Sequence, residues 1–185
     1  MTTTVQVERL GPAELRDLEA ALCDVYRQCF TEPPWHETPA QVGAYATALA
    51  DHLAQPGMSA LVVRTTDGIA GVIYGWPAPP RLPRDSFHDT LVSHVPAHVR
   101  RDLVAPAIVV VELMVHPAHR GRGIGRSLIE QYVEGHPAAW LCTHPDAPAT
   151  ALYESAGWQR RGSFSNQNGD PRVVYTWTSD EDKSP

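Results

Sequence analysis

A glycine-rich segment that also carries arginines lies between an apolar run and a helix-like segment. It reads Arg120-Gly121-Arg122-Gly123-Ile124-Gly125-Arg126, after the apolar run 107–114 and before the helical pattern of 127–134. The first N–H groups of a helix have no intrahelical partner, and the helix dipole favours an anion beside them. Glycines leave the backbone open to such an anion because they carry no side chain. This order of strand, glycine turn and helix therefore predicts a phosphate-binding turn.

Two common phosphate motifs do not fit this turn. A P-loop needs Gly-Lys-Ser/Thr after its first glycine, and the turn has no lysine. A dinucleotide motif needs G-x-G-x-x-G near the start of a strand–helix–strand unit, whereas the order here is G-x-G-x-G, late in the chain. An ordinary strand-to-helix loop remains the alternative to a phosphate site.

One carboxylate, Glu112, interrupts the apolar run that leads into the turn. A carboxylate in a central strand is costly unless it is paired or functional. Desolvation would raise its pKa toward neutrality, which suits a general base. The alternatives are a structural carboxylate paired with an arginine and one that only attracts a cationic amine, and the sequence leaves all three open.

Two segments together resemble the motifs of a known enzyme superfamily. The spacing Arg120-x-x-Gly123-x-Gly125, after Leu-Met-Val-His-Pro, resembles the acetyl-CoA motif of the GNAT acetyltransferases. The stretch 146–158 resembles their closing motif, with Asp146 at a position usually held by Asn and a tryptophan at a position usually held by Phe. The matching positions of this closing motif are Ala149, Leu152, Tyr153 and Gly157. We expect Asp146 to be the N-cap of the helix that contains Tyr153, and Gly157 to end that helix.

This resemblance implies acetyl-CoA as co-substrate and assigns roles to residues of both motifs. The backbone of Leu113, Met114 and Val115 would hold the pantetheine arm and the thioester carbonyl. Tyr153 would protonate the departing thiolate, the alternative being a core aromatic. Asp146 would contact the cofactor, although the substitution puts an amide contact in doubt. The pyrophosphate would be held by Gly121, Arg122, Gly123, Ile124, Gly125 and Arg126, with Arg120 supporting the turn or a phosphate.

An acidic and aromatic loop lies between the first two expected helices. Glu32 and Glu37 flank the segment Pro33-Pro34-Trp35-His36 there, which contains Trp35. An aromatic ring and a carboxylate can receive a cationic amine by stacking and charge. The alternative is a surface loop that Trp35 holds to the core.

Hydrophobic periodicity predicts the elements that would position these residues. Thr38, Pro39 and Gln41 have the pattern of an N-cap, a helical first residue and a capping box. The expected elements are a strand at 5–10, helices over 12–30 and from 39 to about 53, strands at 58–65 and 69–76, two short helices within a Pro-rich insertion at 77–106, a strand at 107–115, a helix to about 134, a strand at 138–143, the Tyr153 helix and a strand at 173–178.

This order predicts an α/β fold and resembles that of the GNAT superfamily. We expect a single domain over 1–178, with a mixed central β-sheet flanked by helices on both faces, and a disordered acidic tail at 179–185.

The composition of the chain limits the classes of partner that we expect it to bind. The 185 residues carry a net charge of −6 without a basic cluster outside the turn, which argues against nucleic acid. No apolar run is long enough to span a membrane, and the N-terminus lacks the pattern of a secretory signal. The three cysteines, Cys23, Cys29 and Cys142, have no zinc spacing and suggest reduced thiols in a cytoplasmic protein. His94 and His98, with a proline between them, do not suggest a metal site.

The sequence therefore predicts an acetyl-CoA-dependent N-acetyltransferase. Direct transfer in a ternary complex is expected because no cysteine is placed as an acyl carrier. The preferred acceptor is a primary amine of a small molecule, and the runner-up is a protein N-terminus or lysine. A non-catalytic acyl-CoA-binding sensor is the alternative of another class, and a homodimer is left open.

Overall fold

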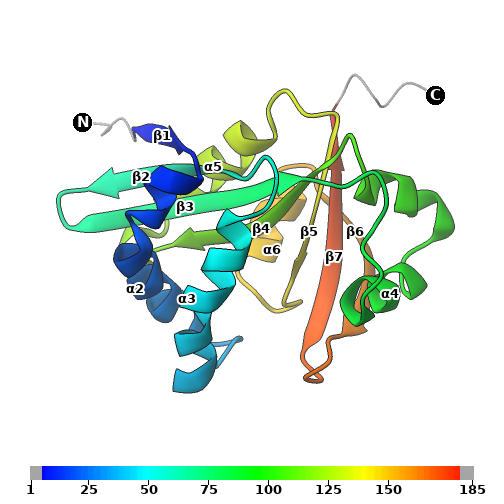
Figure 1. Ribbon diagram of the computed structural model, residues 1–185, viewed down its shortest axis with the longest axis horizontal. Helices are drawn as coiled ribbons and strands as arrows, with labels where there is room; N and C mark the ends of the chain where they lie inside the picture. Colours follow the sequence, from blue (N-terminus) through cyan, green and yellow to red (C-terminus); the bar gives the residue numbers. More distant parts are fainter. Residues whose placement is uncertain (1–5, 180–185) are drawn as a thin grey trace. The chain divides into compact units, whose positions relative to one another are not determined.

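The computed structural model describes residues 6–179 and shows a mixed α/β fold, as predicted. Within these residues seven strands form one sheet of parallel and antiparallel pairs, in the order β1-β2-β3-β4-β5-β7-β6 (Figure 1). The chain divides into two compact units, one running through Trp76 and continuing at Val111–Tyr132, the other made of Pro77–Val110 and the residues from Val133 onward. The predicted boundaries of one domain over 1–178 stay a prediction.

Three antiparallel strands form the sheet portion of the first unit. They are β1 (Val7–Leu10), β2 (Ser59–Thr65) and β3 (Gly68–Pro77). Residues 66–67 connect the antiparallel strands β2 and β3 as a hairpin, and a bulge lies between Val63 and Arg64. Residues on one side of these strands pack with the helices of the unit into a core that contains Leu10, Tyr45, Leu49, Val62 and Tyr74.

The first predicted helix is divided in two. The structure has α1 (Pro12–Arg16) and α2 (Glu19–Phe30) in place of one helix over 12–30. The Leu18 N–H donates to the carbonyl of Leu15, three residues back, at 3.1 Å, and the regular ladder restarts with Leu22 N–H to Leu18 C=O at 2.8 Å. The break involves neither proline nor glycine, and the hydrophobic spacing continues through it. The sequence pattern therefore gives no sign of the break.

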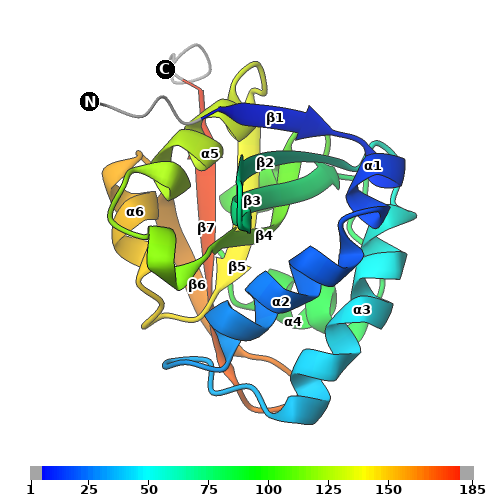
Figure 2. The ribbon, with the colours of Figure 1, turned by 90° about the vertical axis from the view of Figure 1, so that its left-hand side faces the viewer.

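The second predicted helix forms with its capping box. In α3 (Pro39–Leu53) the Gln41 N–H donates to Thr38 Oγ1 at 3.3 Å, and the Thr38 N–H donates to Gln41 Oε1 at 2.8 Å. Two otherwise unpaired donors at the helix start are thereby satisfied. Figure 2 shows α2 and α3 side by side.

The strand and helix around the glycine-rich turn follow later in the chain. They are β4 (Ile108–Val115), the short 3-10 helix η2 (Pro117–His119) and α5 (Ile124–Val133). The helix starts at Ile124, three residues before the predicted Ser127, because Ile124 is buried and belongs to the apolar face of α5 with Leu128. The glycines and arginines around Ile124 interrupt the hydrophobic pattern, so the sequence does not indicate this first turn of the helix.

The second unit contains the insertion and the C-terminal part of the sheet. The two predicted helices of the insertion form as α4 (Ser86–Ser93) and the 3-10 helix η1 (Ala97–Leu103). They are followed by β5 (Ala138–Thr143), α6 (Ala149–Ser155), β6 (Gln159–Ser165) and β7 (Pro171–Thr178). β5 pairs in parallel with the start of β4 and antiparallel with β7.

The strand β6 was not predicted. It pairs antiparallel with β7 at the edge of the sheet, and Phe164 is the one buried residue among its seven. An edge strand that exposes most of its side chains lacks the apolar alternation by which strands are found. The turn residues Asn166-Gln167-Asn168-Gly169-Asp170 were the available signal for a hairpin.

Two further expectations concern the C-terminal part. The prediction that Asp146 is the N-cap of the Tyr153 helix is wrong, because α6 begins at Ala149 after Pro148 and has no side-chain cap. Gly157, with φ 86°, follows that helix in the left-handed region, as predicted for its C-terminal stop. Of the tail predicted at 179–185, Ser179 donates its N–H to the carbonyl of Pro137 at 2.9 Å, and the rest lies outside the described residues.

Candidate active site

The glycine-rich turn has an open backbone at the start of a helix. Gly121 and Gly123 adopt φ of 73° and 78°, a region that favours glycine. A Cβ atom at either position would meet no atom within 4 Å. The first bond of α5 runs from the Ser127 N–H to the Gly123 carbonyl at 3.0 Å, so the N–H groups before Ser127 have no acceptor within the helix. This geometry fits a phosphate or pyrophosphate group.

Arg120 connects the turn to the end of β4. Its Nε donates to the carbonyl of Val115 at 3.1 Å, and its Nη1 lies 3.4 Å from Oε2 of Glu32. Cys29 Sγ donates to the same Val115 carbonyl at 3.4 Å. These contacts tie Arg120 to the end of β4, and its predicted role at the turn or at a phosphate stays a prediction. The Val115 carbonyl thus accepts two side-chain hydrogen bonds at the end of β4.

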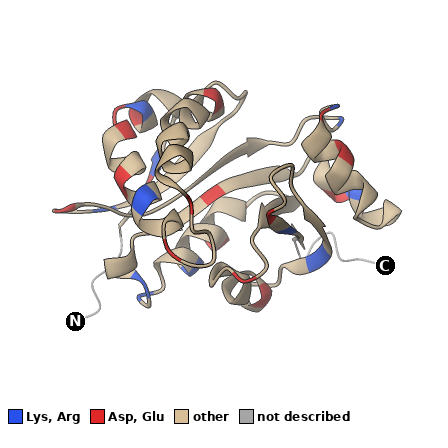
Figure 3. Cartoon of the chain, turned by 90° about the horizontal axis from the view of Figure 1, so that it is seen from below, with Lys and Arg blue, Asp and Glu red and all other residues tan. Residues whose placement is uncertain are grey.

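The glycine-rich turn carries three arginines, Arg120, Arg122 and Arg126. Arg126 pairs with Glu130 at 2.8 Å, one helical turn away, and Arg122 is exposed. Elsewhere the basic and acidic residues are scattered over helices and loops (Figure 3). This distribution suits a small anion at the turn better than a long polyanion.

Glu112 is half-buried in β4 and lies in a cluster of tyrosines. Burial is the main cause that raises the pKa of Tyr26, Tyr45 and Tyr74, and the negative charge of Glu112 is the second cause for each of them. All three phenols therefore stay protonated at neutral pH and can act as hydrogen-bond donors to an anion.

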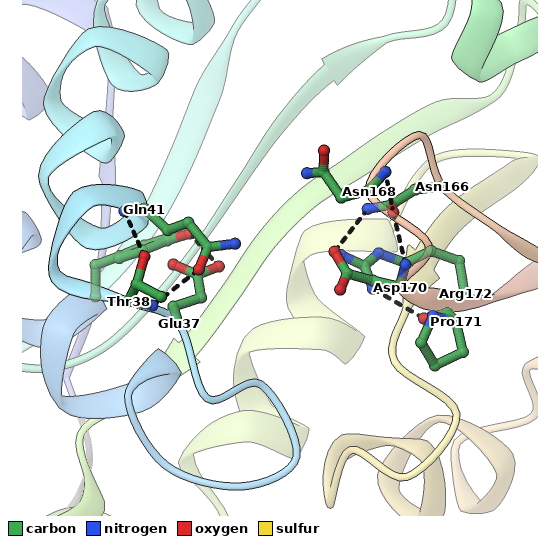
Figure 4. Close-up of polar contacts among 9 residues, drawn as sticks. Glu37, Thr38, Gln41, Asn166, Asn168, Asp170, Pro171 and Arg172 are labelled. Carbon is green, nitrogen blue, oxygen red and sulfur yellow. Dashed lines mark hydrogen bonds and ion pairs between the residues drawn. The ribbon is translucent and has the colours of Figure 1, made fainter.

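A second carboxylate reaches the same cluster from the loop between α2 and α3. The Tyr26 hydroxyl donates to Oε1 of Glu37 at 3.0 Å, and Glu37 also contributes to the raised pKa of Tyr26. The Glu37 N–H donates to the carbonyl of Phe30 at 2.9 Å, which anchors the loop. Figure 4 shows Glu37 next to the hydrogen-bonded pair Thr38 and Gln41 at the start of α3.

Trp35 and Glu32 of this loop make structural contacts. The Trp35 ring lies edge-on to Phe30, with centroids 5.1 Å apart, and packs against the core. This is the holding role that the sequence offered as the alternative for Trp35. Glu32 pairs with Arg120, so its charge is partly neutralised. Acceptor binding by either residue stays a prediction.

A chain of hydrogen bonds that the sequence did not predict extends from the tyrosine cluster. The hydroxyls of Tyr45 and Tyr74 lie 3.1 Å apart, and His52 Nδ1 lies 3.1 Å from the Tyr74 hydroxyl. The Tyr45 ring is stacked on Tyr26, with centroids 4.0 Å apart. Tyr45 and Tyr74 lie in the apolar patterns of an expected helix and an expected strand, and no local spacing marks these residues or His52 as partners.

The closing-motif residues belong to the second unit. Tyr153 is buried, with the rings of Trp158 and Tyr175 at 5.8 and 5.7 Å between centroids. Asp146 is exposed, and its N–H donates to His144 Nδ1 at 3.1 Å. The roles of Tyr153 and Asp146 in catalysis and cofactor binding stay predictions.

The described residues contain neither a candidate metal site nor a candidate membrane-spanning helix. Among residues 6–179 no group of three or more His, Cys, Asp or Glu side chains could hold a metal ion. Across the same residues no helix has the length and apolar character needed to cross a bilayer.

Comparison with known proteins places this geometry in a family. The model of the acetyltransferase (GNAT) family matches residues 19–158. Aminoglycoside 6'-acetyltransferase type Ii has a similar structure, with TM-score 0.61, 17% identity and 94% and 96% of the two chains covered. PaiA N-acetyltransferase from Thermoplasma acidophilum, solved with coenzyme A, is similar with TM-score 0.61 and 10% identity, over 96% of this chain and 100% of that chain. The ribosomal-protein-S18-alanine N-acetyltransferase from Escherichia coli is similar with TM-score 0.60 and 14% identity, over 94% of this chain and 92% of that chain. No curated protein matches the chain by sequence.

Proposed function

The chain belongs to the acetyltransferase (GNAT) family, and on that premise we propose that it transfers the acetyl group of acetyl-CoA directly to a primary amine of a small cationic molecule. GNAT enzymes use acetyl-CoA, which supplies the thioester for the transfer. The observation that carries the proposal is the open glycine turn at the start of α5, where Gly121 and Gly123 leave the backbone accessible.

The cofactor side of the site would use backbone groups. The residues from Gly121 to Arg126 would hold the pyrophosphate at the start of α5. The backbone of Leu113, Met114 and Val115 would hold the pantetheine arm and polarise the thioester carbonyl. Arg120, bonded to the Val115 carbonyl, would keep the turn in place. Asp146 would also contact the cofactor.

The acceptor side would be acidic and aromatic. Glu112 and Glu37 both act on the Tyr26 hydroxyl, so two carboxylates lie near one point of the unit. Half-buried carboxylates beside aromatic rings attract an ammonium group. Glu112 would then remove a proton from the bound ammonium, and Tyr153 would give a proton to the thiolate.

The cysteines favour direct transfer over an acetyl-enzyme. Burial raises the pKa of all three thiols, Cys23, Cys29 and Cys142, above the ordinary value. The thiolate is the nucleophilic form of cysteine, so these side chains are poor acyl acceptors at neutral pH. Protein mixed with acetyl-CoA alone should therefore show no acetyl adduct by mass spectrometry. A stoichiometric adduct that later moves to an amine would disprove direct transfer.

The main test is an amine screen that detects free CoA by its thiol. Polyamines, aminoglycosides and amino acids form one arm, and peptides with a free N-terminus or a lysine form the other. Turnover of a small cationic amine supports the proposal. Turnover of peptides alone would favour the protein-acetylating alternative. Tight acetyl-CoA binding without turnover in either arm would favour an acyl-CoA sensor.

A further inference from the structure

A buried chain of three polar side chains leads away from the acidic cluster. Tyr45 of α3 and Tyr74 of β3 are 3% and 0% exposed, and their hydroxyls lie 3.1 Å apart. The chain continues from the Tyr74 hydroxyl to Nδ1 of His52, again over 3.1 Å. His52 lies one residue before the end of α3 and is half-buried, so its ring is the outermost group of the chain.

Each link of this chain can pass a proton. A phenol hydroxyl has one proton to donate and lone pairs to accept, and a neutral imidazole donates at one nitrogen and accepts at the other. When Nδ1 of His52 accepts, Tyr74 donates to His52 and Tyr45 donates to Tyr74. Tyr45 then has a free lone pair at the inner end of the chain. A proton that arrives there can move outward by exchange along the existing hydrogen bonds.

The inner end of the chain belongs to the tyrosine cluster around Glu112, the base of the proposed reaction. Tyr45 stacks on Tyr26, whose hydroxyl is bonded to Glu37. The charge of Glu112 acts on both Tyr45 and Tyr74. A base that is half-buried must return its proton to solvent before the next turnover, and a hydrogen-bonded path makes this possible without opening the cluster.

We propose that Tyr45, Tyr74 and His52 form a proton relay that carries the proton of the acceptor ammonium from Glu112 to solvent. This inference rests on the proposed function. The ammonium N–H bond breaks as Glu112 gains the proton, and Glu112 passes it to the Tyr45 oxygen. Tyr45 gives its own proton to Tyr74, and Tyr74 gives its own to Nδ1 of His52. The imidazolium then loses the Nε2 proton to water, so one proton enters and one leaves.

The relay is tested with variants that keep shape but interrupt the chain. Tyr74→Phe and Tyr45→Phe keep the rings and remove one hydroxyl each. His52→Asn keeps a polar group near the place of Nδ1 but has no titrating nitrogen. Tyr132→Phe is the matched control because Tyr132 is also buried, and its hydroxyl donates to the Ser59 carbonyl at 3.0 Å, outside the relay.

We expect kcat to fall by about tenfold to 100-fold in each relay variant, with acetyl-CoA affinity unchanged. The solvent deuterium isotope effect on kcat should increase in these variants, because proton release becomes rate-limiting. Tyr132→Phe should lose similar thermal stability while keeping kcat and the isotope effect. His52→Ala should be slow and should recover with added imidazole, which can replace the missing proton acceptor.

Two outcomes would overturn the relay. One is that all relay variants behave like Tyr132→Phe. The other is that His52→Ala shows no response to imidazole while Tyr45→Phe keeps full kcat. Either result in an enzyme whose wild-type form turns over an amine would leave the proposed function intact and remove the relay alone. A wild-type enzyme that turns over no amine would instead reject the proposed function.

Discussion

Gly71 of β3 lies against Ile124, the first residue of α5. A Cβ atom built at Gly71 would stand 2.7 Å from Cγ2 of Ile124 and 3.1 Å from Cδ1 of Leu128. The missing side chain at Gly71 thus allows the start of α5 to pack directly on the strand. The proposed pyrophosphate site at the same helix start depends on this close approach.

Gly71→Ala should therefore disturb both stability and cofactor binding. Inserting a methyl group into a filled contact costs about 1–3 kcal/mol through displaced neighbours. The displacement would move the first turn of α5, so we expect weaker acetyl-CoA binding as well as a lower Tm. Gly43→Ala is the control, because a Cβ at Gly43 of α3 meets nothing within 4 Å and alanine favours a helix. That variant should gain about 0.5–1 kcal/mol. Full acetyl-CoA affinity in Gly71→Ala would contradict the role of the close contact.

Gly123→Glu should abolish acetyl-CoA binding while the fold persists. The side chain would occupy the proposed phosphate position and add a repelling charge. Gly169→Glu is the matched control, since Gly169 has φ 82° and the same open surroundings in the turn between β6 and β7. The two variants should lose similar stability through the strained backbone. Isothermal titration with CoA should separate them, and equal affinities would remove the turn as the phosphate site.

The pH dependence of stability should report the burial of His52. Burial lowers its pKa below the ordinary 6.5, and the nearby charge of Asp51 on the same helix opposes this shift. The facing groups from β3 are the Tyr74 hydroxyl and the Trp76 ring. The unfolded chain thus binds the proton more readily than the folded one. The contribution of the buried, neutral His52 ring to the free energy of unfolding is complete above about pH 6.5. It decreases as the pH drops through the pKa of His52 in the folded protein.

The comparison uses His52→Asn, which removes the titrating group. Between about pH 8 and about pH 5 the wild type should lose more free energy of unfolding than the variant, as measured by urea titration at each pH. Parallel curves would show that the ring does not lose solvation on folding.

Local signals in the sequence were enough for elements that depend on neighbouring residues. The capping box at Thr38 and Gln41 appears at its predicted place, and a glycine turn precedes α5 although the helix starts three residues earlier than predicted. Both depend on partners that lie within a few positions in the chain. The break near Leu18 involves a change of hydrogen-bond partner without a change of hydrophobic spacing. The exposed edge strand β6 offers little apolar pattern. Neither the break near Leu18 nor strand β6 therefore has a strong local signal in the sequence.

The candidate site was predicted in part for the same reason. Glu112 stood out because a carboxylate interrupts an apolar strand. Its tyrosine neighbours could not be predicted as a cluster, since Tyr45 and Tyr74 are 29 positions apart and each reads as a core aromatic. Only the packing of α3 on β3 turns two apolar-looking positions into a pair of bonded hydroxyls.

Tyr153→Phe should slow the chemical step if the hydroxyl protonates the thiolate. The ring packing beside Trp158 and Tyr175 would be kept, and only the proton donor would be lost. We expect kcat to fall roughly 10²-fold with little change in KM. Tyr175→Phe is the control, because it removes a neighbouring hydroxyl that is bonded to Glu154 at 2.8 Å. Equal activity of the two variants would leave Tyr153 as a core aromatic.

Glu112→Gln should distinguish a general base from a residue that only binds the acceptor. The amide keeps the shape and loses the proton acceptor. If Glu112 is the base, kcat falls, the acidic limb of the kcat/KM profile flattens, and activity recovers as rising pH deprotonates the amine in solution. If Glu112 only attracts a cation, KM rises and the acidic limb stays. Glu37→Gln is the comparison, because Glu37 also reaches Tyr26 but is proposed for binding alone, so its variant should raise KM only. A Glu112→Gln enzyme with the wild-type kcat, KM and pH profile would reject both roles and leave this carboxylate a structural part of β4.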